Sequence, residues 1–163
     1  MRENHGNTQF VGITSSLPSI PDLHCLWKAG VEHRERAVVD TNVIWQLFCT
    51  RERDIDELVD RCIPCTVEIV EQEFEMMCIQ RGISSTACDR FLDRFTFIPT
   101  RLRLENVKEC IGALPRAASI VARKNLADSV IALTTLESGI STILTCNYRH
   151  FRPWVPYGLR IIA

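Results

Sequence analysis

The sequence predicts an α/β protein, a three-layer α/β/α sandwich built on a central, mainly parallel sheet. Short apolar runs alternate with longer helical patterns after about residue 36, as in chains built from βαβ units. The run that ends at Val39 is apolar without alternation, which is typical of a strand covered on both faces. A chain of 163 residues can bury one sizeable core. We therefore expect a single globular domain.

The first half of this domain is expected to hold two strands. "AVVDTNVIWQLF" predicts a buried strand that runs into a helix, and "DIDELVDRC" continues as a helix with acids in its first turn. "IPCTV" predicts the second strand. "EIVEQEFEMMCIQRG" then predicts a helix that stops at Gly82. The apolar face of this helix consists of Ile69, Val70, Phe74, Met77 and Cys78.

The second half repeats this alternation. "TACDRFLDRF" predicts an amphipathic helix, and "FTFIPTRL" predicts a strand with Pro99 near its end. "ENVKECIGALPRAASIVARKN" predicts a helix in two pieces around Pro115. The remaining elements are a helix in "LADSVIALTTLESG" that ends at Gly139, a strand in "STILTCN" and a short final strand in "LRIIA".

Residues 1–36 are expected to form an N-terminal arm or extension, separate from the domain at 37–163. The stretch mixes Asn, Ser, Pro and Gly and has no sustained hydrophobic period. It is nevertheless too apolar for a free linker. Its apolar residues include Phe10, Leu17, Ile20, Leu23, Leu26 and Trp27. We expect the arm to fold onto the domain or onto a partner.

The charge of the chain limits the kinds of partner it can attract. A formal net charge of -1 gives no bulk attraction to phosphate, so contact with nucleic acid would depend on local basic patches. The candidate pairs are Arg34 and Arg36, Arg101 and Arg103, Arg123 and Lys124, and Arg149 and Arg152. The alternative interpretation of each pair is an ordinary solvated surface.

The chain shows neither a secretory signal nor a membrane span. Its first ten residues carry an acid and lack an apolar core, and no run approaches the ~18 apolar residues that a span needs. We expect a cytoplasmic protein without a membrane partner.

Eight cysteines are then expected to act mostly as small buried apolar residues. The pair Cys62 and Cys65 could hold metal or act in redox chemistry, but no second closely spaced Cys or His pair follows it.

Three acids and two neutral polar residues stand at positions that the apolar pattern does not explain. Asp40 ends the first strand, Glu73 lies close to an apolar helix face, and Asp128 lies in the first turn of a helix. Thr145 and Asn147 follow the strand in "STIL". Each acid has a structural alternative: Asp40 and Asp128 could cap or charge-stabilise a helix N-terminus, and Glu73 has Glu68, Glu71 and Glu75 as rivals.

A parallel sheet would bring these residues together. Asp40 and Asn147 would emerge at the same carboxyl edge, and helices entering from that edge could point Glu73 and Asp128 into the same crevice. Clustered carboxylates repel one another unless a cation neutralises them. Oxygen ligands without a His/Cys set favour Mg²⁺ or Mn²⁺ and a phosphate-containing substrate.

Four segments in this order, "VVDTNVIW", "VEQEF", "LADSVIALTTLESG" and "LTCNYRHF", resemble the successive motifs of the PIN-domain ribonucleases, over roughly residues 37–163. The nearest resemblance is to VapC-type toxins of toxin–antitoxin systems. It implies a metal-dependent endoribonuclease, a hydrolase that cuts RNA phosphodiesters to 5′-phosphate and 3′-hydroxyl products. It also implies a homodimer and a small antitoxin protein as partner.

The resemblance assigns roles to individual residues. Asp40, Glu73 and Asp128 would be the acidic Mg²⁺ or Mn²⁺ ligands, and Asn147 would complete the catalytic set. Many family members carry an acid at the position of Asn147, so three fixed negative charges remain here and one tightly bound metal is expected. The supporting polar groups would be Thr41, Asn42 and Thr145; the RNA contacts would be Arg123, Lys124, Arg149 and His150, with Trp45 or Trp154 as possible stacking partners of a base.

Three alternatives stand beside this interpretation. A strand ending in Asp also occurs in HAD-type phosphatases, whose chemistry needs D-x-D where this chain has Asn42. A catalytically silent PIN-like domain could bind RNA or protein through the same crevice, as Asn147 makes conceivable. The acids could also be helix caps alone, in which case their removal would cost roughly 0.5 to 2 kcal/mol of stability each.

Overall fold

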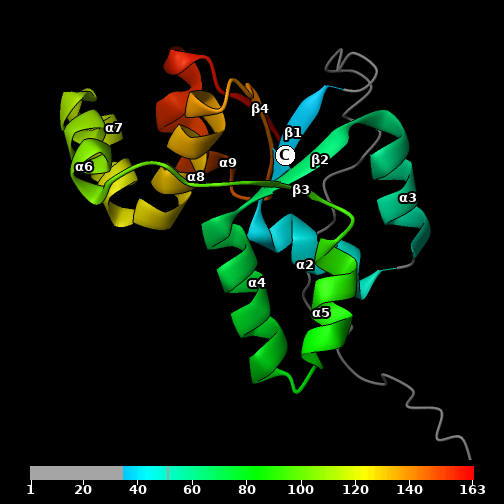
Figure 1. Cartoon of the computed structure of the whole chain (residues 1–163). Helices are drawn as coiled ribbons and strands as arrows, with labels where there is room; N and C mark the ends of the chain where they lie inside the picture. The colour runs from blue at the N-terminus through cyan, green and yellow to red at the C-terminus, as the bar shows by residue number, and fades with distance from the viewer. Residues whose placement is uncertain (1–34, 51) are drawn as a thin grey trace, which may run out of the picture.

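The protein is built around a five-stranded parallel sheet with strand order β3-β2-β1-β4-β5. A computed structural model describes residues 35–50 and 52–163 (Figure 1). The strands are β1 (Arg36–Val39), β2 (Ile63–Val67), β3 (Thr96–Ile98), β4 (Thr142–Leu144) and β5 (Arg160–Ile162). The α/β fold with a parallel sheet is the one that the sequence predicts.

β1 forms the centre of the sheet, because it pairs with β2 on one side and with β4 on the other. Val38 lies opposite Cys65 of β2 and opposite Ile143 of β4, and all three residues are buried. The continuous apolar run of β1 is therefore explained by helices on both faces of the sheet.

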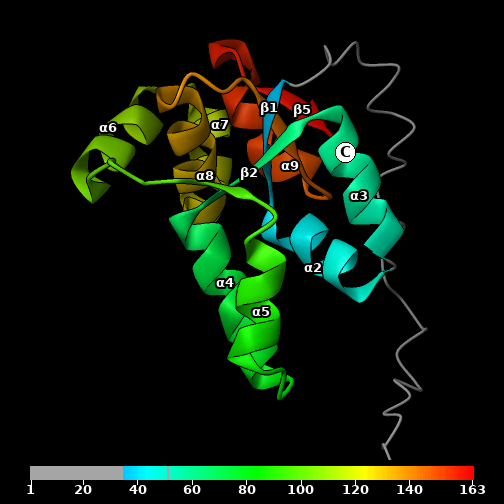
Figure 2. The same ribbon diagram turned by 45° about the vertical axis from the view of Figure 1, so that its right-hand side comes forward.

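Helices cover both faces of the sheet, as Figures 1 and 2 show. The segments between β1 and β3 supply one layer: α2 (Thr41–Cys49), α3 (Glu52–Arg61), α4 (Glu68–Gln80) and α5 (Ser85–Leu92). The segments between β3 and β5 supply the other layer: α6 (Leu104–Ala113), α7 (Arg116–Lys124), α8 (Leu126–Glu137), α9 (Tyr148–Phe151) and the 3₁₀ helix η1 (Arg152–Tyr157). The molecule is thus a three-layer α/β/α sandwich.

The strand order places a topological switch point between β1 and β4. From β1 the chain moves outward to β2 and β3, and it then returns across the sheet to β4 and β5. The connections on the two sides of this point lie on opposite faces, and in α/β sheets this arrangement places ligand sites at the carboxyl ends of the strands, here β1 and β4. α4 and α8 come from different layers and contact each other.

The ends of two helices follow the sequence pattern closely. Gly82 and Gly139 adopt positive φ values of 67° and 70° after α4 and α8, as expected of glycines that terminate helices. The helix expected around Pro115 is indeed divided there into α6 and α7. These helix ends could be predicted from the sequence because glycine and proline act locally on the backbone.

The helical segment at 148–157 is a feature that the periodicity did not predict. α9 has four residues, and η1 contains Pro153 and Pro156, so neither can display a helical hydrophobic period. Phe151 and Trp154 of this segment are buried in the core. The burial of Trp154, at 2% exposure, favours a core role over the stacking role considered for it.

The described cysteines are free thiols, in line with the expectation of buried apolar roles for most of them. Cys62, Cys65, Cys78 and Cys88 are buried, whereas Cys49 and Cys110 are exposed. Cys146 is half-buried. Cys25 and the rest of the arm up to residue 34 lie outside the described residues. Within the described part of the chain, no helix has the length and apolar character that a membrane crossing requires.

Candidate active site

The carboxyl ends of β1 and β4 meet at Asp40 and the segment Thr145–Asn147. The backbone N–H of Asp40 donates to the carbonyl of Leu144 at 2.9 Å, which extends the β1–β4 pairing by one step. Asp40 is also the N-cap residue of α2. It is therefore held at the switch point by its own backbone, with its side chain directed beyond the sheet.

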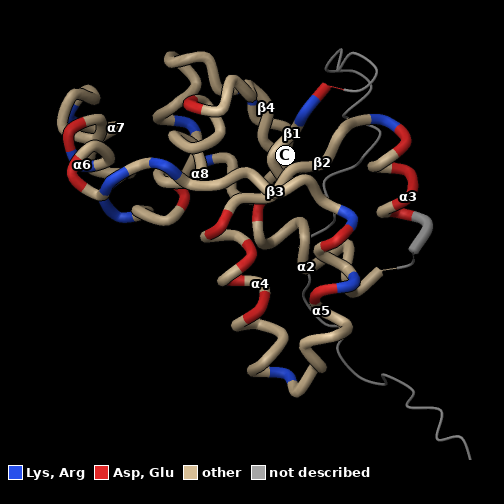
Figure 3. Tube along the Cα trace, in the orientation of Figure 1, with Lys and Arg blue, Asp and Glu red and all other residues tan. Residues whose placement is uncertain are grey.

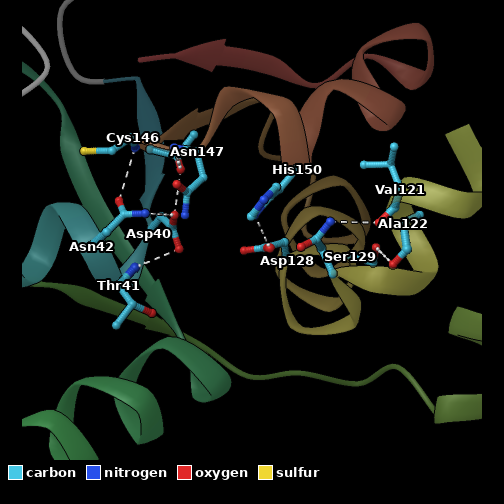
Figure 4. A network of polar contacts seen from close by, with 12 residues as sticks. Asp40, Thr41, Asn42, Val121, Ala122, Asp128, Ser129, Cys146, Asn147 and His150 are labelled. Atoms are coloured by element: carbon cyan, nitrogen blue, oxygen red, sulfur yellow. Dashed lines mark hydrogen bonds and ion pairs between the residues drawn. The ribbon is translucent and has the colours of Figure 1, made fainter. Parts of the chain in front are cut away.

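Asp40 is buried, with 3% of its surface exposed, and its carboxylate accepts three hydrogen bonds from the protein. Its Oδ1 accepts from the backbone N–H of Thr41 at 2.8 Å. Its Oδ2 accepts from Nδ2 of Asn42 at 2.9 Å and from the hydroxyl of Thr145 at 2.6 Å. The network is visible in Figure 4. Asp40 thus combines the capping role with a buried, oriented carboxylate.

Asn42 and Thr145 link this carboxylate to the loop after β4. The backbone N–H of Cys146 donates to Oδ1 of Asn42 at 3.1 Å, and that of Asn147 donates to Oγ1 of Thr145 at 2.9 Å. The backbone of Asn147 is thereby fixed beside Asp40, while its carboxamide belongs to an exposed residue. Thr145 and Asn42 hold the loop in the position from which Asn147 can reach a ligand.

Glu73 reaches the site from α4. Its Oε2 accepts from the hydroxyl of Thr41 at 2.5 Å, and Thr41 adjoins Asp40. The rival Glu71 has other surroundings: burial raises its pKa, and the negative charges of Glu75 and Glu68 add to this increase. Among the acids of this stretch, Glu73 is the one that hydrogen bonds a neighbour of Asp40.

Asp128 faces the site from the first turn of α8. Its Oδ2 lies 2.9 Å from Nδ1 of His150, which belongs to α9, and Figure 4 shows the two side chains against each other. The turn that carries Asp128 is braced by Ser129, whose hydroxyl donates to the carbonyl of Ala122 at 3.0 Å. This brace joins the end of α7 to the start of α8.

The three carboxylates influence one another electrostatically. Burial raises the pKa of Asp40 from 3.8 to about 6; the hydrogen bond from Thr145 opposes this increase, and the negative charges of Asp128 and Glu73 add to it. Burial also raises the pKa of Asp128, against the charge and hydrogen bond of His150 and with the charge of Glu73. Negative charge therefore accumulates at this edge of the sheet with incomplete compensation.

The chemistry of these donors fits a hard divalent cation. The available ligands are carboxylate oxygens and the Asn147 carboxamide, and a cation would offset the burial and the neighbouring negative charges that raise the pKa of Asp40. In the described residues, no three His, Cys, Asp or Glu side chains are grouped closely enough to form a ready-made metal site. Mg²⁺ commonly uses one or two carboxylates and retains several waters, so such a group is not a requirement for it.

The basic residues considered for RNA binding occupy two places. Arg123 and Lys124 are exposed at the end of α7, and Arg149 is exposed in α9. His150 instead lies against Asp128, so its first contact is with the proposed metal ligand. Figure 3 shows acids along α4, and residues of both charges around α6 and α7. Trp45 is half-buried and packs against Phe48 and Phe74.

Two polar residues that contribute to the site were not singled out from the sequence. Ser129 braces the turn of Asp128, and Nδ2 of Asn125 donates to the carbonyl of Val121 at 2.9 Å in the same junction. Ser129 could have been found from the sequence, because a serine stands there on the apolar side of "LADSVIALTTL", where the structure buries it. The pairing of His150 with Asp128 had no signal, because it joins positions 22 residues apart.

Comparison with known proteins gives no assignment. No protein-family model matches the chain. No curated protein matches it either.

Proposed function

We propose that this chain is a Mg²⁺- or Mn²⁺-dependent endoribonuclease of the toxin type. The observation that carries the proposal is the convergence of Asp40, Glu73 and Asp128 from β1, α4 and α8, near enough for their charges to act on one another. The order of the four motifs that resemble PIN-domain ribonucleases supports it. The proposed reaction is hydrolysis of an RNA phosphodiester.

Asp40 and Asp128 would hold the cation, and Glu73 would complete the shell, directly or through water. When bound, Mg²⁺ or Mn²⁺ supplies the positive charge that activates water and stabilises charge on phosphate oxygens. Thr41 and Thr145 orient two of these carboxylates through hydrogen bonds of 2.5 and 2.6 Å. Because these bonds fix the acceptor oxygens, they limit the reorganisation that binding requires.

Asn147 and His150 have positioning roles in this proposal. The carboxamide of Asn147 can both donate and accept, so it can orient a water or the scissile phosphate. His150 holds Asp128 through its Nδ1 at 2.9 Å, and it fixes the direction of that carboxylate. With three acids and one amide, the site would bind one metal ion tightly. Any second cation would be held mainly by the substrate phosphate.

The substrate and partners follow from the surroundings of the site. Exposed Arg123, Lys124 and Arg149 would contact RNA phosphates, since the net charge of -1 provides no general attraction. An antitoxin segment would inhibit the enzyme by covering the carboxylates, for example with an Arg that pairs with them. A homodimer and a cytoplasmic location belong to the same proposal.

A matched pair of variants on α4 tests the function. Glu73→Gln removes the carboxylate that Thr41 contacts, whereas Glu75→Gln removes an exposed acid of the same helix. We expect Glu73→Gln to lower metal-dependent cleavage of an RNA pool by about 10²-fold or more, as for loss of a group that acts at the reacting centre. Glu75→Gln should retain the wild-type rate. Equal rates in the two variants would remove Glu73 from the mechanism.

The second candidate function is a catalytically silent module that binds RNA or protein at the same crevice. Asn147 favours it, because an amide stands where many PIN-domain ribonucleases carry an acid. The two candidates differ in one respect that can be measured. Binding of RNA that is unaffected by EDTA, without cleavage in Mg²⁺ or Mn²⁺, would support the silent module.

A further inference from the structure

A surface pocket lies between α2, α3 and α5, away from the carboxylates of the candidate active site. It encloses about 500 Å³. We call it the α2–α5 pocket, and it is lined by Leu47, Phe48, Thr50, Ile55, Ser84, Thr86, Ala87, Arg90, Phe91 and Arg94. Figures 1 and 2 show these three helices grouped on the same side of the sheet.

The pocket has an apolar floor and a polar rim. Phe48 and Phe91 contact each other edge to face, with ring centroids 5.2 Å apart, and both are only half-buried. Thr86 and Arg90 are exposed at the rim, in the first and last turns of α5 respectively. A hollow of this size with an aromatic floor and a few polar groups is suited to apolar side chains.

The structure fixes the point at which the N-terminal arm leaves the domain. The carbonyl of Glu35 accepts from the backbone N–H of Ile63 at 3.0 Å. The carboxylate of Glu35 pairs with Arg160 and accepts from the hydroxyl of Thr142 at 3.1 Å. Glu35 is therefore tied to β2 on one side and to β4 and β5 on the other. The arm begins beside the C-terminal end of α3.

Exposed apolar residues lead from this point to the pocket. Ile63 is 38% exposed beside Glu35, and Val59 of α3 is 41% exposed one turn earlier. Ile55, one further turn along the same face, lines the pocket. At the helical rise, Val59 and Ile55 lie roughly 6 Å apart along α3. Residues 28–34 can extend up to about 23 Å, so the apolar residues that precede them can reach the pocket.

We propose that residues 17–27 of this chain bind in the α2–α5 pocket. This segment, "LPSIPDLHCLW", contains five large apolar residues, namely Leu17, Ile20, Leu23, Leu26 and Trp27. Contiguous apolar surface of this kind is unfavourable when it faces water. Asp22, in the middle of the segment, is complementary in charge to Arg90 at the rim.

The covalent link favours the chain's own arm over other occupants. A short tether gives an intramolecular segment an effective concentration of the order of mM, far above that of a second copy in dilute solution. Binding in the pocket would cover Phe48, Phe91 and Val59 with the arm. The arm would then form part of the domain surface on the face of α2, α3 and α5, independent of whether the carboxylate site cleaves RNA.

Hydrogen exchange of the full chain tests this proposal. Wild-type peptides covering 17–27 should exchange about tenfold or more slowly than expected for an unstructured segment. Ala87→Glu places a charge at the pocket and should abolish this protection, while α5 is preserved because Glu at this position can complete a capping box with Ser84. Ser85→Glu, on the same first turn but outside the pocket lining, should leave the protection intact.

A variant in the arm tests the same contact from the side of the bound segment. Leu26→Glu should release 17–27 as Ala87→Glu does, whereas Phe10→Glu, outside the proposed segment, should not. The protection should persist on roughly 40-fold dilution, since an intramolecular contact does not depend on concentration. Protection that disappears on dilution would assign the pocket to a second copy and overturn the proposal. The absence of protection in the wild type, or protection that survives both Glu variants, would also overturn it.

Discussion

Asp40 combines two roles that the sequence presents as alternatives. It is the N-cap of α2, with its Oδ1 bonded to the N–H of Thr41, and it is also a buried acid beside two others. Capping alone would not require burial at 3% exposure, because an exposed Asp can cap a helix. The burial and the raised pKa are the properties that connect Asp40 with function.

The raised pKa of Asp40 makes the stability of the metal-free protein depend on pH. Since the folded protein retains the proton up to about pH 6 and the unfolded chain releases it near 3.8, the free energy of unfolding should fall across this interval and then level off. A shift of this size corresponds to about 3 kcal/mol. The measurement is urea denaturation in EDTA across the same pH interval.

Asp40→Asn serves as the comparison for this pH effect. The variant cannot ionise at this position, so its stability should fall less across the interval than that of the wild type. Asp128, whose pKa is also raised by burial, titrates in both proteins. Parallel stability profiles for the two proteins would mean that Asp40 is not the group whose ionisation is disfavoured.

Thr145 allows the orientation of Asp40 to be tested separately. Thr145→Val preserves shape but removes the hydroxyl that donates to Asp40 at 2.6 Å and accepts from Asn147 N–H at 2.9 Å. Because that donor favours the ionised form, its loss should raise the pKa of Asp40 further and weaken Mg²⁺ binding at neutral pH. Calorimetric titration with Mg²⁺ measures the change; an unaltered affinity would contradict the proposed role.

At the scale of elements, the position of α8 depends on its junction with α7. Ser129 is fully buried and its hydroxyl bonds the Ala122 carbonyl, so it fixes the turn that presents Asp128. Ser129→Ala should reduce stability by about 1 kcal/mol and also reduce the rate of cleavage. The measurements are chemical denaturation and kcat on one RNA substrate.

A second residue of α8 supplies the control for Ser129. The buried hydroxyl of Thr135 donates to the Ile131 carbonyl at 2.7 Å, farther along the helix from Asp128. Thr135→Val should cost a similar free energy of unfolding but retain the wild-type kcat. If both variants lost activity in proportion to stability, the brace would have no specific effect on the site.

The end of α8 shows a backbone requirement that is independent of side-chain packing. Gly139 has φ of 70°, and no atom lies within 4 Å of the place where a Cβ would be. Gly139→Ala should therefore destabilise the protein by about 1 to 2 kcal/mol through the left-handed conformation alone, without changing kcat. Denaturation and cleavage assays check the two parts; an unchanged stability would contradict the conformational cause.

At the scale of the whole molecule, a bound cation should stabilise the fold, since the carboxylates converge in the folded state. At a Mg²⁺ concentration of about 100 times Kd, the free energy of unfolding should rise by about 2.7 kcal/mol. The increase should be lost in Asp128→Asn, which weakens the site at α8. Thermal unfolding with Mg²⁺ and with EDTA provides the measurement, and equal shifts in both proteins would indicate binding elsewhere.

The sheet and most helices could be predicted from the sequence because their signals are local. Buried strands such as β1 are continuous apolar runs, and Gly82 and Gly139 stop helices through their own backbone. α9 and η1 could not be predicted, because a short helix and a proline-containing 3₁₀ turn have no period. Their burial depends on contacts that form only in the assembled core.

The site was predictable in its position but not in its contacts. The strand ends placed Asp40 and Asn147 at one edge, as the topology of a parallel sheet requires. The pairing of His150 with Asp128 and the brace of Ser129 depend on how α7, α8 and α9 meet. Such contacts between elements leave no pattern along the chain.

RNA cleavage by purified full-length protein, in Mg²⁺, Mn²⁺ or EDTA, tests the central claim most directly. Asp40→Asn and Asp128→Asn are measured alongside, with thermal unfolding as proof of folding. The proposal predicts cleavage that requires metal and is lost in both folded variants. Intact RNA with every metal, or cleavage that persists in both variants, would contradict a nuclease centred on these carboxylates.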